Sequence, residues 1–166
     1  MKMSGSGRAL AAVALAGAAV LAAAGPAGAD ERPTRTCAPG ELTVRIGERP
    51  SPSAADRLFV IGFRGNEGVS CLLSGALDYI RFYDTSGRPL DVRFSDKSAV
   101  PPFEQVPVND FREAVVYVAA PKRGGSLPIG GMAFSVPTAP ESEMKAAWPA
   151  PVAGPLRITG IMSPAS

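Results

Sequence analysis

Histidine is absent from the 166 residues, and the chain has only two cysteines and one tryptophan. Without histidine it lacks the commonest general base of enzymes and the commonest metal ligand of proteins. Cys37 and Cys71 are far apart in the sequence, so they form neither a Cys-x-x-Cys redox motif nor a cysteine–histidine catalytic pair. Long helical periodicity is also missing, and this argues against an all-helical fold.

The one long apolar run lies near the start of the chain. It extends from Ala9 to Gly25, is preceded by Lys2 and Arg8, and is followed by Pro26-Ala27-Gly28-Ala29. A basic start, an apolar middle and a small-x-small end are typical of a secretory signal peptide. The run is shorter than a spanning helix requires and is mostly alanine and glycine, so an uncleaved anchor is the less favoured alternative. We expect residues 1–29 to be cleaved and the mature chain to be secreted, either free or associated with the cell envelope.

The charge of the chain is nearly balanced. The formal net charge of +2 comes from Lys2 and Arg8 of the predicted signal peptide, so the remaining chain is neutral. A neutral surface has no long-range attraction for nucleic acid or anionic lipid. We therefore expect no nucleic-acid partner and no membrane binding after signal cleavage.

The mature chain has the length of one ordinary domain and is divided by glycine and proline into short segments. Residues 30–40 are polar and are expected to form a flexible lead-in to a single domain at 41–166. Apolar patterning predicts strands at 41–47, 57–64, 70–74, 77–83, 90–94, 111–119, 131–136 and 156–161. The longest candidate helix covers 141–148, between two prolines. Short strands at this spacing predict an all-β, immunoglobulin-like, two-sheet antiparallel β-sandwich.

The mature chain contains an even number of cysteines, two, and is expected to reach an oxidising compartment. Such a pair favours a structural disulfide over a redox or metal site. A Cys37–Cys71 bond would join the lead-in to the body of the sheet.

A wider pattern surrounds these cysteines. Cys37 precedes Asn66, and Asn66 is followed by Cys71-Leu-Leu-Ser-Gly75 and by a strand that ends in Asp84-Thr-Ser-Gly87. This Cys … Asn-x(4)-Cys-x-Leu-x-Gly arrangement resembles an uncharacterised family of secreted actinobacterial domains, over most of the mature chain. The resemblance implies an immunoglobulin-like fold and no assigned activity. The chain departs from the family pattern at Ala76-Leu77 and Asn109-Asp110, where the family has Tyr-Pro and Pro-Gly.

Three residues are candidate contacts for a partner. Trp148 lies in a proline-rich segment, where it either plugs one end of the sandwich, the alternative that we favour, or forms an exposed anchor. Lys122 and Arg123 precede two glycines and are predicted to occupy a loop tip that could contact anionic wall polymers.

Other constellations give weaker signals. Ser142 and Lys145 have the Ser-x-x-Lys spacing of some acyl enzymes, but the further motifs of those enzymes are missing. Four aspartates fit no calcium loop, and three methionines lack the histidine that usually accompanies them in copper carriers. These residues are Asp78, Asp84, Asp91, Asp96, Met132, Met144 and Met162. We expect no catalytic residue, no metal site and no cofactor.

These observations predict a secreted, non-enzymatic β-sandwich module that binds a protein or cell-envelope partner. One alternative is an extracytoplasmic carrier of a small ligand or metal, which would need an apolar pocket or a methionine–aspartate cluster. Another alternative is a protease inhibitor with a rigid exposed loop at residues 101–103 or 137–140.

Overall fold

The structure is a computed structural model that describes residues 33–95 and 103–165. The predicted signal peptide and Asp96 lie outside the described residues. The chain divides into a first unit, Met1–Glu31, and a second unit, Arg32–Ser166, which contains every element described below.

The described part of the chain is all-β and contains no α-helix. A 3-10 turn, η1 (Pro39–Glu41), precedes the first strand, and every pairing between the strands is antiparallel. The strands are β1 (Leu42–Arg49), β2 (Asp56–Gly65), β3 (Cys71–Leu73), β4 (Asp78–Asp84), β5 (Pro89–Leu90), β6 (Val106–Val108), β7 (Glu113–Pro121), β8 (Ile129–Val136), β9 (Ala139–Ala147) and β10 (Arg157–Ile158).

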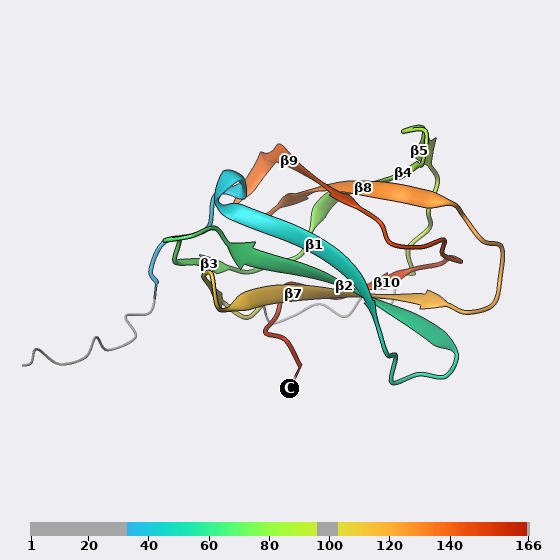
Figure 1. Cartoon of the computed structure of the whole chain (residues 1–166), viewed down its shortest axis with the longest axis horizontal. Helices are drawn as coiled ribbons and strands as arrows, with labels where there is room; N and C mark the ends of the chain where they lie inside the picture. Colours follow the sequence, from blue (N-terminus) through green and yellow to red (C-terminus); the bar gives the residue numbers. More distant parts are fainter. Residues whose placement is uncertain (1–32, 96–102, 166) are drawn as a thin grey trace, which may run out of the picture. The chain divides into compact units, whose positions relative to one another are not determined.

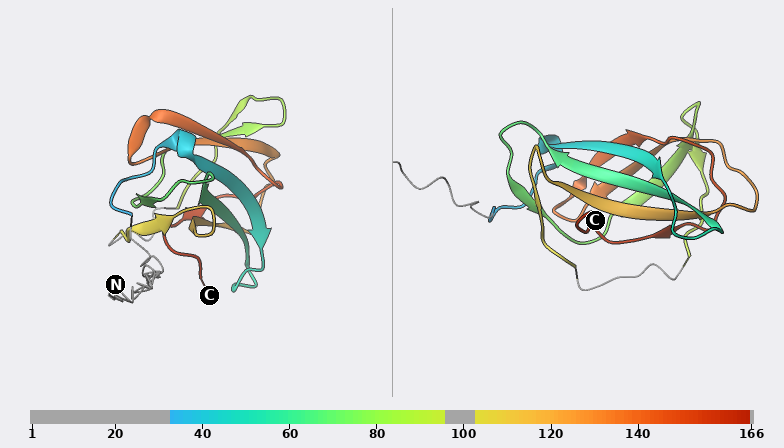
Figure 2. Two further views of the ribbon diagram at one scale, coloured as in Figure 1. Left: turned by 60° about the vertical axis from the view of Figure 1, so that its left-hand side comes forward. Right: turned by 60° about the horizontal axis from the view of Figure 1, so that its bottom comes forward.

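Two four-stranded sheets face each other across the core. The first has the order β1-β2-β7-β10 and the second the order β5-β4-β8-β9, while β3 and β6 form a separate two-stranded sheet. Figure 1 shows the second sheet above the first, and the turned views of Figure 2 show the same two layers. The predicted all-β class with antiparallel sheets is confirmed.

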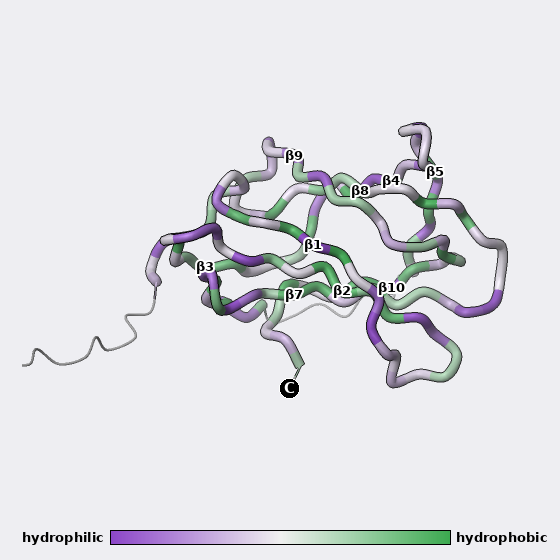
Figure 3. Tube along the Cα trace, in the orientation of Figure 1, coloured by the Kyte–Doolittle hydropathy of each residue, from purple (hydrophilic) through white to green (hydrophobic). Residues whose placement is uncertain are grey.

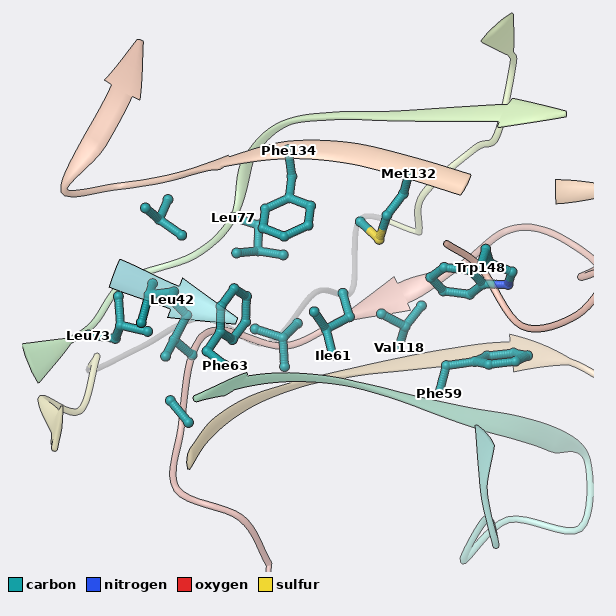
Figure 4. Packing of buried hydrophobic residues seen from close by; sticks show 14 of the residues in the cluster. Leu42, Phe59, Ile61, Phe63, Leu73, Leu77, Val118, Met132, Phe134 and Trp148 are labelled. Atoms are coloured by element: carbon teal, nitrogen blue, oxygen red, sulfur yellow. The ribbon is translucent and has the colours of Figure 1, made fainter. Parts of the chain in front are cut away.

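The core lies between the two sheets because each strand alternates its side chains between the faces. Phe59, Ile61 and Phe63 of β2 are fully buried, and Phe63 meets Phe134 of β8 edge to face with ring centroids 5.8 Å apart. Figure 4 shows Phe134 and Met132 pointing toward these residues from the opposite sheet. In Figure 3 the hydrophobic colour follows β2 and β7, the two central strands of the first sheet.

The predicted helix at 141–148 is wrong, because this segment is strand β9. It pairs with β8, with Phe134 opposite Met144 and Met132 opposite Ala146. Met144 and Ala146 are half-buried while Lys145 is exposed, which is the two-residue period of a strand on a sheet edge. Pairing with β8 therefore determines the conformation of a segment whose own residues carry no strong preference.

The predicted return strand at 90–94 is much shorter than expected. Only Pro89 and Leu90 pair with β4, as β5. Phe94 instead forms an isolated bridge with Leu156, in the segment that leads into β10. The chain thus leaves the second sheet after Leu90 and crosses toward the first.

The edge of β7 that faces away from β2 is paired with residues from the end of the described chain. Beyond β10, Val115 and Met162 exchange two backbone hydrogen bonds of 2.9 Å, and the Thr159 amide donates to the Tyr117 carbonyl at 3.0 Å. This C-terminal segment extends the pairing that β10 begins, so most of the β7 edge is hydrogen-bonded.

The predicted disulfide is confirmed. Cys37 and Cys71 are bonded, 34 residues apart in sequence, and both are buried. The Cys37 amide donates to Leu72 at 3.0 Å, and the Leu72 amide donates to Arg35 at 2.8 Å. From Arg35 onward the expected lead-in is therefore paired with β3, and the disulfide fixes it there.

The β4–β5 hairpin is held by the carboxylate of Asp84. It accepts hydrogen bonds from the backbone amides of Arg88 (2.9 Å) and Ser86 (2.8 Å) and from the Ser86 hydroxyl (2.8 Å). These donors, with the Arg88 guanidinium, lower the pKa of Asp84 to about 2. Gly87 has φ +81°, which a residue with a side chain rarely adopts. The Asp84–Gly87 segment therefore forms the turn of this hairpin.

Tyr79 adopts a left-handed backbone conformation at an irregularity of β4. Its φ is 50°, and the β4–β8 register shifts between Asp78 and Arg81. Tyr79 is 72% exposed, so its ring contributes little to the core. The left-handed region costs a residue with a β carbon about 1–2 kcal/mol.

Replacing Tyr79 with glycine is expected to raise the free energy of unfolding by about 1 kcal/mol, since glycine has no steric cost at this φ. Urea denaturation followed by circular dichroism measures the change. Tyr79→Ala retains the strain and should show no gain. A glycine variant that is no more stable than the alanine variant would contradict the prediction.

Candidate functional site

Trp148 belongs to the core. It is 5% exposed, and its ring centroid lies 4.9 Å from that of Phe59 and 5.4 Å from that of Phe82. Figure 4 shows it at one end of the row of core side chains. The favoured interpretation as a plug is confirmed, and the exposed anchor for a partner is wrong. Its Nε1 has no hydrogen-bond partner among the residues that the structure describes.

Lys122 and Arg123 are exposed in the loop after β7, as the glycines beside them predicted. The Lys122 amide donates to Ala55 at 2.8 Å, which joins this loop to the one before β2. Because Trp148 is buried and the two basic side chains are on the surface, the three predicted contacts do not form one binding patch.

The weaker constellations are separated by the fold. Ser142 and Lys145 lie three residues apart on strand β9, where such positions point to opposite faces. Within 33–95 and 103–165, no three acidic or cysteine side chains are grouped to hold a metal ion. Met132 is in the core, Met144 packs against it, and Met162 is exposed beyond β10.

A surface groove that the residue patterns did not reveal lies on the outer face of β1 and β2. Its volume is about 520 Å³. In the β1–β2 register Arg45 is opposite Gly62, and Gly47 is opposite Val60. Because the two glycines carry no side chain, this face is hollowed next to the side chains of Arg45 and Val60. The lining residues are Thr43, Arg45, Ile46, Gly47, Arg49, Val60, Gly62, Arg64, Gly65, Asn66, Glu67 and Glu113.

The groove carries more positive than negative side chains. Arg64 lies 3.7 Å from a carboxylate oxygen of Glu113, which partly neutralises it. The side chains of Arg45 and Arg49 make no hydrogen bond or ion pair with any other residue in the described ranges. Guanidinium groups at the groove are thus free to pair with an anionic ligand.

Phe111 stands beside this groove on the turn between β6 and β7. It is 86% exposed, and the Asn109 carboxamide oxygen accepts the amides of Phe111 at 2.8 Å and Arg112 at 2.7 Å. These bonds hold the turn in one conformation with the ring in solvent. A second hollow of about 450 Å³ adjoins it, lined by Arg64, Val106, Pro107, Phe111, Arg112, Glu113, Ser163 and Pro164.

The two hollows share Arg64 and Glu113, so they form one surface, which we call the Arg–Phe surface. The sequence contained part of this signal. The predicted strand at 41–47 includes Arg45, but it ends at Gly47, two residues before β1 ends. Phe111 was assigned to the next strand, and its exposure depends on a turn that Asn109 closes.

The part of the chain that the structure describes contains no helix that is long and apolar enough to cross a membrane.

The comparisons leave the family of the chain open. No family model, no curated protein and no solved structure matches it. The resemblance carried by Asn66 and Cys71 stays a prediction.

Proposed function

We propose that this chain is a secreted, non-enzymatic, immunoglobulin-like β-sandwich that binds a protein partner through the Arg–Phe surface. Phe111 carries this proposal, because a rigid turn holds a large apolar ring almost fully in water. Aromatic side chains beside arginines are enriched among the residues that dominate binding at protein interfaces. Arg64 lies in the adjoining hollow, together with Pro107 and Pro164.

The disulfide supports an extracytoplasmic location, because such bonds persist in oxidising compartments. The grouping of two four-stranded sheets around one core supports the sandwich. The absence of histidine supports a binding role over a catalytic one, since an enzyme would need another general base.

The test is selection of binders from a phage-displayed library of random peptides on the oxidised protein. Peptides that bind the wild-type chain should bind Phe111→Ser at least about tenfold more weakly, as expected for loss of a central aromatic contact. Tyr79→Ser is the matched control, since Tyr79 is also exposed but lies on the other sheet. A selection that yields no binders, or binders that tolerate Phe111→Ser, would overturn the proposal.

A further inference from the structure

Gly47 and Gly62 lie in the middle of regular strands, where glycine is unfavourable. The β1–β2 register is unbroken through both positions, so neither belongs to a β-bulge. Neither has a positive φ. Glycine within a strand is destabilising relative to alanine, because it loses more conformational entropy on folding. Where no bulge requires it, glycine indicates that a ligand or another backbone approaches closely.

The protein's own chain does not need a glycine at position 47. A β carbon built on Gly47 would have no heavy atom of residues 33–95 and 103–165 within 4 Å, so no strand or loop in these ranges approaches this position. At Gly62 the three atoms nearest to a β carbon would be two of the Glu113 side chain and the Arg45 carbonyl oxygen, with Glu113 Oε2 at 3.2 Å. The space above Gly47 is therefore open to a molecule from outside.

Arginines flank this open space along β1. Arg45 and Arg49 are on the same face as Gly47 and on either side of it. Their α carbons are about 14 Å apart at the rise of an extended chain. Acidic residues four positions apart in an extended peptide have the same spacing and also share a face. A peptide along β1 could therefore pair one carboxylate with each guanidinium and place a small residue above Gly47.

The charged side chains that line the groove and their positions indicate which class of ligand it binds. The lining includes three arginines and two glutamates, and the Glu113 carboxylate lies next to Arg64 rather than next to Arg49. Two of the three arginines, Arg45 and Arg49, lie on β1, whereas both lining glutamates lie outside it. No aromatic side chain lines the groove to stack on a sugar ring. Beyond Arg64, the exposed ring of Phe111 offers a contact surface for an apolar side chain of a peptide.

We infer that the groove over Gly47 binds an extended acidic segment of the partner protein, with carboxylates on Arg45 and Arg49 and an apolar residue on Phe111. The inference rests on the proposed function and names the part of the partner that is recognised.

The test uses the oxidised full chain and a fluorescent eleven-residue peptide with glutamate at positions 2 and 6, glycine at 4 and leucine at 10. Gly47→Val should weaken peptide binding at least about tenfold while leaving the protein as stable as before or more stable, because valine suits a strand and finds open space. Gly125→Val is the control, since a β carbon there also has no neighbour within 4 Å but lies outside the groove.

Two further arms separate the possible failures. The double variant Arg45→Gln, Arg49→Gln should bind the acidic peptide more weakly than the wild-type chain does. Its binding of a second peptide, in which glutamine replaces both glutamates, should be unchanged. If library peptides require Phe111 yet tolerate Gly47→Val and the arginine variants, the groove inference fails and the proposed function stands. If heparin binds in a manner sensitive to Gly47→Val and the acidic peptide does not bind, the ligand is an anionic glycan and the inference is overturned.

Discussion

Trp148→Ala is expected to lower the free energy of unfolding by about 3–5 kcal/mol, the range for removing a large aromatic side chain from a core. The indole is 5% exposed and packs on Phe59 and Phe82, one from each main sheet. Its loss would leave a cavity where the two sheets meet. Equilibrium urea denaturation followed by far-ultraviolet circular dichroism measures the change.

Trp148→Phe is the matched control. Phenylalanine refills much of the space and removes the Nε1 donor, which has no partner within the described residues. Because a buried unpaired donor costs about 1–3 kcal/mol, its removal offsets part of the lost packing. The phenylalanine variant should therefore be much closer to wild type than the alanine variant. Equal losses for the two variants would show that ring packing is not the source of the stability.

Removal of the disulfide is expected to cost about 4 kcal/mol. In the chain-entropy model, this is the value for opening a loop the size of that closed by Cys37 and Cys71, which are 34 residues apart. The bond also holds the Arg35–Cys37 segment against β3. The double variant Cys37→Ala, Cys71→Ala should show a lower midpoint in urea.

The reduced wild-type protein provides the comparison. Reduction should lower the free energy of unfolding by about as much as the double alanine substitution does. The two values should differ only by the packing of the two buried sulfur atoms, which the reduced protein retains. A serine pair at the same positions would place hydroxyl groups in the core and should be less stable than the alanine pair. Unchanged midpoints on reduction would mean that the backbone pairing of this segment suffices without the bond.

The sequence predicted most of the sheet because the strands with the strongest patterns are also the most buried. The apolar segment 57–64 around Ile61 was predicted as a strand, and it forms most of β2, which lies between β1 and β7. The errors occur where pairing between distant segments decides the structure. Residues 141–148 become a strand through contact with β8, and Phe94 leaves its hairpin for Leu156. Neither contact has a local signal.

The candidate site was harder to predict for a related reason. A pattern shows which face a residue occupies but not what lies above that face. Gly47 resembled the end of a strand, and only its register with Val60 places it in the middle of one. Phe111 resembled a core residue, since apolar residues usually are buried. Its exposure follows from the turn that Asn109 closes.

The pairing of the C-terminal segment with β7 has a consequence for the kinetics of folding. Thr159 meets Tyr117 across 42 residues of sequence, so the edge of the first sheet is completed late in a chain that emerges from its amino terminus. Contacts between distant residues slow folding. Until residues 157–162 arrive, β7 exposes unpaired amides and carbonyls to any neighbouring chain. Aggregation during refolding should therefore increase with protein concentration, and a chain shortened before Arg157 should self-associate.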